Sequence, residues 1–118
     1  MGQFRVEMAV LPHGGGPARR VDALVDTGAA YSMLPRSLLE SLGHTAVRAQ
    51  RVIMADGRIE EWMVAQAEVE CEGRRTFTPI LMGPAGSPAL LGATTLEELG
   101  LGVDPLGRRL VPVDLYMA

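Results

Sequence analysis

The sequence predicts an all-β (mainly β) fold with two short helices, built as a single domain over residues 1–118. Three observations support this prediction. The length of 118 residues suits one domain. Several segments alternate apolar and polar residues, which is typical of half-buried strands. Gly- and Pro-rich clusters separate these segments, as they do in hairpins and short loops.

Composition excludes several classes of function. The formal net charge is -3, so the chain is a poor candidate for nucleic-acid binding. All eleven basic residues are arginine, which excludes Schiff-base and P-loop lysine chemistry. The single cysteine, Cys71, cannot form an internal disulfide or build a zinc site, and we expect it to be an inert core residue. No apolar run approaches the roughly 20 residues of a membrane span, and we expect a soluble, cytoplasmic protein.

The first third of the chain predicts a hairpin followed by a helix. Residues 4–10 alternate as a strand, residues 12–17 form a Gly- and Pro-rich loop, and residues 19–25 form a second strand that becomes fully apolar at its end. Residues 35–43 then predict a short helix. Proline suits the first position of this helix, and Gly43 suits its C-terminal cap.

The middle of the chain predicts two further hairpins. Residues 47–54 form a strand, the Asp56-Gly57 pair signals a tight turn, and residues 59–71 return as a long strand. A weaker turn at 72–73 leads into a strand at 76–82. Asp56 is interpreted as a turn former rather than as a catalyst.

The last third predicts a short strand and the second helix. After a loop at 83–88, residues 89–92 form an apolar strand that ends in glycine. Thr94 and Thr95 each have a glutamate three residues later, the pattern of a capping box, so a helix should begin there and end at Gly100. The chain then ends with two more predicted elements, a type I turn at 104–107 and a strand at 110–115.

The stretch with the clearest chemical meaning is Asp26-Thr27-Gly28. A carboxylate at the end of a buried strand needs hydrogen-bond donors or a proton. Gly28 lets the backbone turn sharply and present amide N–H groups to that carboxylate, and the hydroxyl of Thr27 can lock the loop. The flanking residues are apolar or small, which does not suit an ordinary surface turn. They are Leu24, Val25, Ala29 and Ala30.

One carboxylate cannot act as general acid and general base at the same time. Two carboxylates that share a proton can do so, because like charges about 3 Å apart cannot both ionise. The chain offers only one aspartate of this kind, Asp26. The simplest solution is a two-fold homodimer, which places Asp26 beside its own copy.

The stretch "LVDTGAAYSMLP", followed some sixty residues later by "ALLGATTLEELGL", resembles the retropepsin-like aspartic proteases. The order of predicted elements is similar as well, so the resemblance covers about the whole chain. It implies an acid-protease barrel with one lobe per chain. It also implies a homodimeric aspartic endopeptidase that hydrolyses peptide bonds with water activated by two Asp26 carboxylates.

The resemblance also implies roles for individual residues, with no metal and no cofactor. Asp26 would be catalytic, and Thr27, Gly28 and Ala29 would support the active-site loop. Leu90, Leu91 and Gly92 would pass behind that loop and hold it. A hairpin tip would close over a peptide or protein substrate as a flap. This tip comprises Met54, Ala55, Asp56, Gly57 and Arg58.

Some features depart from the family or stay open. The tip carries Asp56 and Arg58, whereas retroviral flap tips are rich in glycine and isoleucine, and Pro112 weakens the last strand. Trp62 either lines a substrate groove or is a core or dimer-contact residue. We expect His44 to be an exposed loop residue. Two alternatives to an enzyme that is active by itself remain. One is a catalytically silent peptide-binding or dimerisation module of the same fold, and the other is an enzyme that stays inactive until it is processed or joined by a partner.

Overall fold

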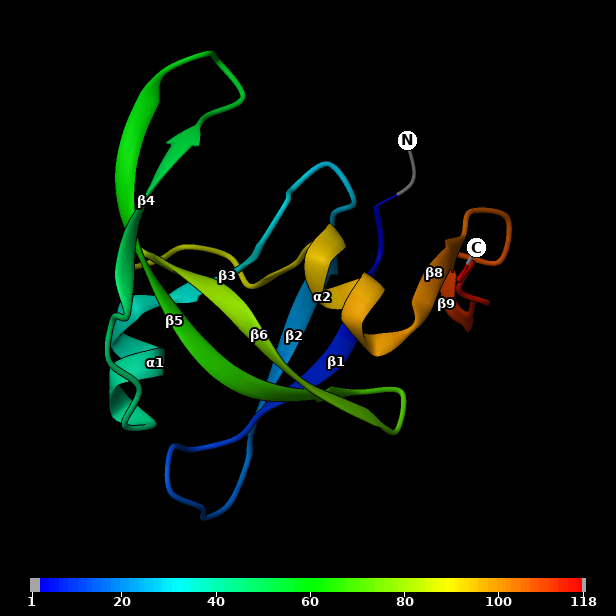
Figure 1. Cartoon of the computed structure of the whole chain (residues 1–118), viewed down its shortest axis with the longest axis horizontal. Coiled ribbons are helices and arrows are strands. Elements are labelled where there is room, and N and C mark those ends of the chain that lie inside the picture. Colours follow the sequence, from blue (N-terminus) through cyan, green and yellow to red (C-terminus); the bar gives the residue numbers. More distant parts are fainter. Residues whose placement is uncertain (1–2, 118) are drawn as a thin grey trace.

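The computed structural model describes residues 3–117, in which a seven-stranded sheet closes on itself (Figure 1). Its strand order is β1-β2-β7-β3-β6-β5-β4, and β1 also pairs with β5. The strands are β1 Arg5–Val10, β2 Arg19–Val25, β3 Ser32–Pro35, β4 Arg48–Ile53, β5 Ile59–Cys71, β6 Arg74–Gly83, β7 Leu90–Leu91, β8 Leu101–Asp104 and β9 Arg109–Pro112. The helices are α1 Arg36–Ser41 and α2 Ala93–Leu99, and neither is long and apolar enough to cross a membrane.

Antiparallel hairpins form most of the sheet, as the sequence predicts. β1 pairs with β2, β4 with β5, and β5 with β6. The β4–β5 turn is closed by the N–H of Met54, which donates to the carbonyl of Arg58 at 2.8 Å, and by Gly57 at a φ of 90°. The predicted Asp56-Gly57 turn is therefore confirmed. A residue with a side chain would be strained at that φ.

Parallel pairings bring the two halves of the chain together. β7 pairs with β2, so that Val25 lies opposite Leu91, and β3 pairs with β6. The sequence did not predict β3. This strand has four residues, and its first three are buried, so it shows no alternation. It is a strand only because β6 and β7 flank it.

The core lies inside the closed sheet, and both helices contribute to it, α1 through Leu39 and α2 through Leu96 and Leu99. Met8, Leu34, Ile80 and Leu91 are fully buried there. Cys71 is buried as predicted. Burial, with a smaller contribution from the charge of Glu72, raises the pKa of its thiol to about 11.

Two predictions about polar residues are wrong. α2 begins at Ala93 without any side-chain cap, and Thr95 is fully buried rather than capping the helix. His44 is 6% exposed, because the loop after β1 folds back onto the end of α1. The N–H of His13 donates to the carbonyl of Leu42 at 2.9 Å, and the Nε2 of His44 lies 2.8 Å from the carbonyl oxygen of Leu11.

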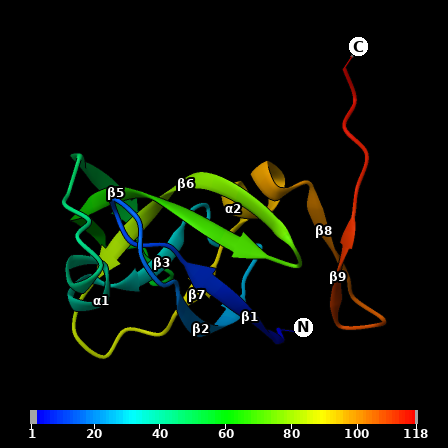
Figure 2. The same cartoon turned by 90° about the horizontal axis from the view of Figure 1, so that it is seen from below.

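The C-terminal residues form a separate two-stranded sheet, β8–β9, which stands beside the closed sheet (Figure 2). β8 was not predicted, because its glycine and four-residue length give a weak strand pattern. The predicted strand at 110–115 ends instead at Pro112. That residue lies opposite Leu101, where β8 begins, so the strand ends there, although the N–H of Val113 still donates to the carbonyl of Gly100 at 3.0 Å. We call residues 101–117 the C-terminal arm.

Candidate active site

Asp26 lies directly after β2, held by the backbone on both sides. Its N–H donates to the carbonyl of Leu91 at 3.0 Å, and its carbonyl accepts the N–H of Ala29 at 3.1 Å. The side-chain Oδ1 accepts the N–H of Gly28 at 3.0 Å. The carboxylate is half-buried, so it is fixed in position yet open to solvent. The predicted amide contact from the turn to the aspartate is therefore present.

The loop that follows Asp26 is tied to the start of α2. The N–H of Ala93 donates to the carbonyl of Ala29 at 2.8 Å, and the N–H of Thr94 donates to the carbonyl of Ala30 at 2.9 Å. These carbonyls accept hydrogen bonds from N–H groups at the start of the helix. Without them, those N–H groups would need a side-chain cap. This explains why α2 has no side-chain cap.

Gly92 allows the loop and α2 to approach so closely. A Cβ at this position would lie 2.5 Å from the carbonyl carbon and oxygen of Tyr31, closer than any side chain can pack. Leu91 is fully buried beneath the loop, and Leu90 pairs with both Leu24 and Met33. The segment 90–92 thus lies behind the Asp26 loop, where the sequence placed it.

The β4–β5 hairpin and the Asp26 loop enclose a cavity of about 620 Å³. Trp62 lines this cavity, and it also lines a hollow on the other side of β5 with Glu61 and Met63. Its indole N–H donates to the carboxylate of Glu60 at 2.8 Å. The full lining comprises Asp26, Gly28, Ala29, Ala30, Tyr31, Met33, Gln50, Arg51, Val52, Ile53, Met54, Ala55, Trp62, Leu81 and Leu90.

The charged residues at the hairpin tip are paired with one another. Asp56 accepts the N–H of Arg58 at 3.0 Å and its Nε at 2.7 Å, and Arg58 also pairs with Glu60. The backbone N–H of Arg58, and then its guanidinium, hold the pKa of Asp56 below its ordinary value. Asp56 is therefore a turn former, as expected. The apolar side chains beside the tip, Ile53 and Ile59, stay exposed.

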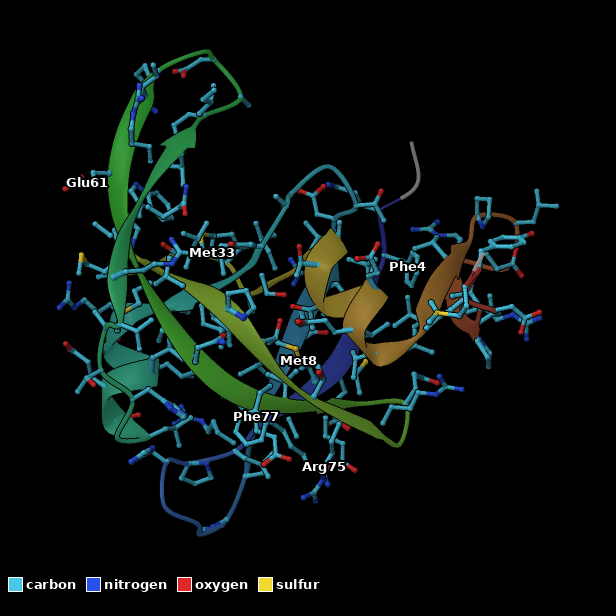
Figure 3. All side chains as sticks on the ribbon, viewed as in Figure 1. Phe4, Met8, Met33, Glu61, Arg75 and Phe77 are labelled. Carbon is cyan, nitrogen blue, oxygen red and sulfur yellow. The ribbon has the colours of Figure 1, made fainter. Side chains whose placement is uncertain are left out.

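A second hollow, of about 340 Å³, lies on the other side of Asp26. It is lined by the N-terminal residues Gln3 and Phe4, by Val25, Asp26 and Thr27, and by Val103 and Pro105 of the C-terminal arm. In Figure 3 Phe4 is seen between α2 and β8. Thr27 is exposed at this hollow. Among residues 3–117, Asp26 is the only carboxylate that lines either cavity.

Comparison with known proteins fits this arrangement. A family profile described as "Aspartyl protease" matches residues 6–104. The chain belongs to this aspartyl protease family. Its fold is similar to the solution structure of the simian foamy virus (mac) protease, with a TM-score of 0.57 and 18% identity over 80% of this chain and 92% of the viral one. None of the curated proteins compared with the chain matches it.

Within this aspartyl protease fold, two polar clusters were missed by the sequence analysis. The hydroxyl of Thr95 lies 2.6 Å from that of Ser32 and 2.8 Å from that of Thr78, all three buried. Ser32 also accepts the N–H of Gly92 at 3.0 Å. The sequence contained a signal for this cluster, namely hydroxyl residues placed among apolar ones. Ser32 lies between the Ala-Ala-Tyr and Met-Leu segments, and Thr95 precedes a core leucine of α2.

The second missed cluster joins the base of the β4–β5 hairpin to Tyr31, at the end of the Asp26 loop. The Nη2 of Arg48 donates to the hydroxyl of Tyr31 at 3.0 Å, and its Nη1 donates to the side-chain carbonyl of Gln50. The guanidinium lies 6.0 Å from the centroid of the Tyr31 ring, within cation–π range. No spacing in the sequence indicates this contact, because it depends on how the hairpin folds over the loop.

Proposed function

We propose that this chain is an aspartic endopeptidase that acts as a homodimer, with one Asp26 from each protomer. The observation that carries the proposal is the state of Asp26 in one chain. It is fixed by three hydrogen bonds, lies between two hollows, and has no second carboxylate in either lining. A second protomer related by a two-fold axis supplies the missing group.

The two carboxylates share one proton and hold a water molecule between them. The ionised carboxylate takes a proton from this water, whose oxygen attacks the carbonyl carbon of the scissile bond. The protonated carboxyl donates a hydrogen bond to the carbonyl oxygen, where negative charge develops. The C–N bond then breaks, the nitrogen leaves with a proton from the dyad, and the products are a carboxylic acid and an amine. In this scheme Thr27, Gly28 and Ala29 shape the loop, and the segment 90–92 supports it.

The substrate would be a peptide segment in an extended conformation. The cavity of about 620 Å³ lies between the Asp26 loop and the β4–β5 hairpin, and its lining is mainly apolar. An extended peptide can pair its backbone with strands on both sides, while its alternate side chains enter pockets. We therefore expect apolar residues next to the cleaved bond. In this proposal the β4–β5 hairpin is the flap, and Met54 and Ala55 contact the substrate.

The decisive experiment compares Asp26→Asn with Asp22→Asn on a peptide library at acidic to neutral pH. Asp22 is an exposed carboxylate on the same strand, so its loss should leave cleavage unchanged. Asp26→Asn removes the general base and should lower the rate at least about a hundredfold. Circular dichroism should show the same fold for both variants. Full activity of Asp26→Asn would refute the mechanism.

The dimer is tested by dilution. Activity per chain should fall once the concentration drops below the dissociation constant, because a monomer holds one carboxylate only. Activity per chain that stays constant while sedimentation shows only monomer would contradict the dimer.

The alternative is a peptide-binding module without catalysis, and the mainly apolar lining of the cavity of about 620 Å³ suits a peptide in that case as well. Such a module would bind peptides equally well with Asp26→Asn and would release no products.

A further inference from the structure

The β4–β5 hairpin has a strand edge that no other strand covers. β5 pairs with β6 only as far as Val64, which lies opposite Leu81, whereas its pairing with β4 continues to Ile59. Among residues 3–117, residues 59–63 therefore have a strand on one side only. Figure 1 shows this part of the hairpin extending beyond the end of β6. We propose that this edge binds an extended, basic segment of the protein substrate, away from the bond that is cleaved.

The inference rests on the proposed function, because its occupant is a segment of the substrate. It goes beyond that function by adding a second peptide site, which lies on the other side of β5 from the catalytic cavity. Binding at the edge does not involve Asp26, so the site can be tested in a chain that cannot cleave.

Alternate backbone groups on this edge point away from β4. The carbonyl of Arg58 accepts the N–H of Met54, on the β4 side. Because these groups alternate in direction along a strand, the N–H and C=O groups of Ile59, Glu61 and Met63 point the other way. An open row of this kind is a template for another strand, and proteins bind extended peptides by adding them to such an edge.

A hollow of about 590 Å³ lies beside the open edge, and we call it the edge hollow. It is bounded by residues 60–63 of β5, by α1, and by residues 82–85 at and after the end of β6. Trp62, Met63 and Met82 give it an apolar wall. A peptide that pairs with the edge would therefore place some of its side chains against apolar surface, as alternate side chains do in strand addition.

The charge of the edge hollow favours a basic peptide. Three glutamates line it, Glu40, Glu60 and Glu61, against one arginine, Arg36. Glu40 is paired with Arg36 at 3.0 Å, and Glu60 is paired with Arg58. Glu61 is exposed and takes part in none of the ion pairs found among residues 3–117. Figure 3 shows Glu61 pointing outward from the hairpin, where a lysine or arginine of the peptide would meet it.

Trp62 connects the edge hollow to the catalytic cavity, since it lines both. The two sites thus lie on opposite sides of the same hairpin. This favours one long substrate over two separate ligands, because the second contact of a linked ligand is intramolecular. A substrate that fills both sites would also hold the hairpin from both sides.

Binding is tested with Asp26→Asn, which prevents cleavage of the probe. The probe is a peptide of about seven residues in which valine and arginine alternate, so that its arginines share one face of the strand. Two controls have the same length. One carries glutamate in place of arginine, and the other carries N-methyl groups on alternate backbone nitrogens, which removes hydrogen-bond donors. The arginine peptide should bind at least about tenfold more tightly than either control.

The location of the bound peptide is measured by NMR. The amide resonances of Glu61 and Met63 should shift and become protected from hydrogen exchange, because their N–H groups donate to the peptide. Those of Glu60 and Trp62 should change less in protection, because these N–H groups already point toward β4.

A charge reversal at Glu61 tests the recognition of basic side chains. Glu61→Arg should weaken binding of the arginine peptide at least about threefold and strengthen binding of the glutamate peptide, as the change of one exposed ion pair predicts. The matched control is Glu98→Arg, at an exposed glutamate of α2 outside the edge hollow, and it should change neither affinity. Circular dichroism should show the same fold for both variants.

The role of the edge in substrate binding is tested by cleavage with the active chain. A short apolar substrate is compared with the same substrate carrying the valine–arginine segment on a flexible linker. The added segment should lower KM at least about threefold and leave kcat unchanged, because it binds equally in the ground state and the transition state. In Glu61→Arg this advantage should disappear, and in Glu98→Arg it should persist.

The inference is overturned if the N-methylated peptide binds as tightly as its parent, if Glu61→Arg and Glu98→Arg behave alike, or if only the amides of the Asp26 loop shift. It is also overturned if the added segment leaves KM unchanged. Failure of the proposed function gives a different result: no form would cleave any peptide, while the arginine peptide would still bind Asp26→Asn at the edge.

Discussion

Three buried hydroxyl groups, those of Ser32, Thr78 and Thr95, join β3 to α2 and β6. Thr95 is the central member, because its Oγ1 contacts both of the others. A hydroxyl inside a core is costly unless it is hydrogen-bonded, and here each member satisfies another. The cluster therefore holds β3, β6 and α2 together while its members stay out of contact with solvent.

Replacing Thr95 with valine keeps the size of the side chain and removes the hydroxyl. Ser32 and Thr78 then lose a buried partner, and the free energy of unfolding should fall by about 1–3 kcal/mol. Urea unfolding measures this change. Thr94→Val is the matched control, since Thr94 is the adjacent residue and is only half-buried. Equal stability of the two variants would show that the cluster contributes nothing.

At the scale of single residues, the sequence predicted contacts that are local. Asp26 and the N–H of Gly28 are two positions apart, so the tripeptide already contains their hydrogen bond. Thr95 and His44 were misinterpreted because their partners lie far away along the chain. A threonine three residues before a glutamate is interpreted as a helix cap. The sequence does not show that the carbonyls of Ala29 and Ala30 accept the N–H groups at the start of α2 instead.

At the scale of elements, the turn of the C-terminal arm depends on Asp104. Its Oδ1 accepts the N–H of Leu106 at 3.1 Å and that of Gly107 at 3.2 Å. The N–H of Gly107 is the main reason that the pKa of Asp104 lies below its ordinary value, and Arg109 adds to the shift. The ionised carboxylate thus organises the β8–β9 hairpin.

The sign of this pKa shift predicts the behaviour of the arm in acid. A lowered pKa in the folded state stabilises the hairpin above the ordinary carboxyl range, near pH 4, and this effect disappears as the pH falls through the lowered value. The amide resonances of Leu106 and Gly107 should therefore titrate below pH 4. Asp104→Asn should abolish that titration, and Asp114→Asn should preserve it. Titration at the ordinary pH, or in Asp104→Asn, would contradict this prediction.

Element length decided which strands could be predicted. β5 has thirteen residues and β6 has ten, and both were evident from their composition and bounding turns. β3 and β8 have four residues each and become strands through their neighbours. β9 ends early for the same reason, because its extent is set by the length of β8.

At the scale of the whole molecule, the proposed homodimer predicts a stability that depends on concentration. Folding is then linked to association, so each tenfold rise in concentration above the dissociation constant should stabilise the dimer by about 1.4 kcal/mol. The midpoint of thermal unfolding should rise accordingly. A constant midpoint over a hundredfold range of concentration would contradict the dimer.

The single aspartate led to the prediction of a second chain, but no local pattern in the sequence indicates where that chain would bind. Residues 110–115 were interpreted as a closing strand. The structure instead ends the strand at Pro112 and leaves Leu115 exposed. Whether an apolar residue is part of a core or of an interface depends on tertiary packing, which local pattern does not contain.

The hydrogen bonds from Ala93 and Thr94 to the carbonyls of Ala29 and Ala30 have a consequence for protein engineering. The Asp26 loop and the first turn of α2 complete each other's hydrogen bonding, although they lie more than sixty residues apart. A designer who transplants the Asp-Thr-Gly tripeptide alone into another barrel would leave both the loop and a helix terminus unsatisfied. The smallest transferable unit of this site is therefore discontinuous: the loop together with residues 90–95.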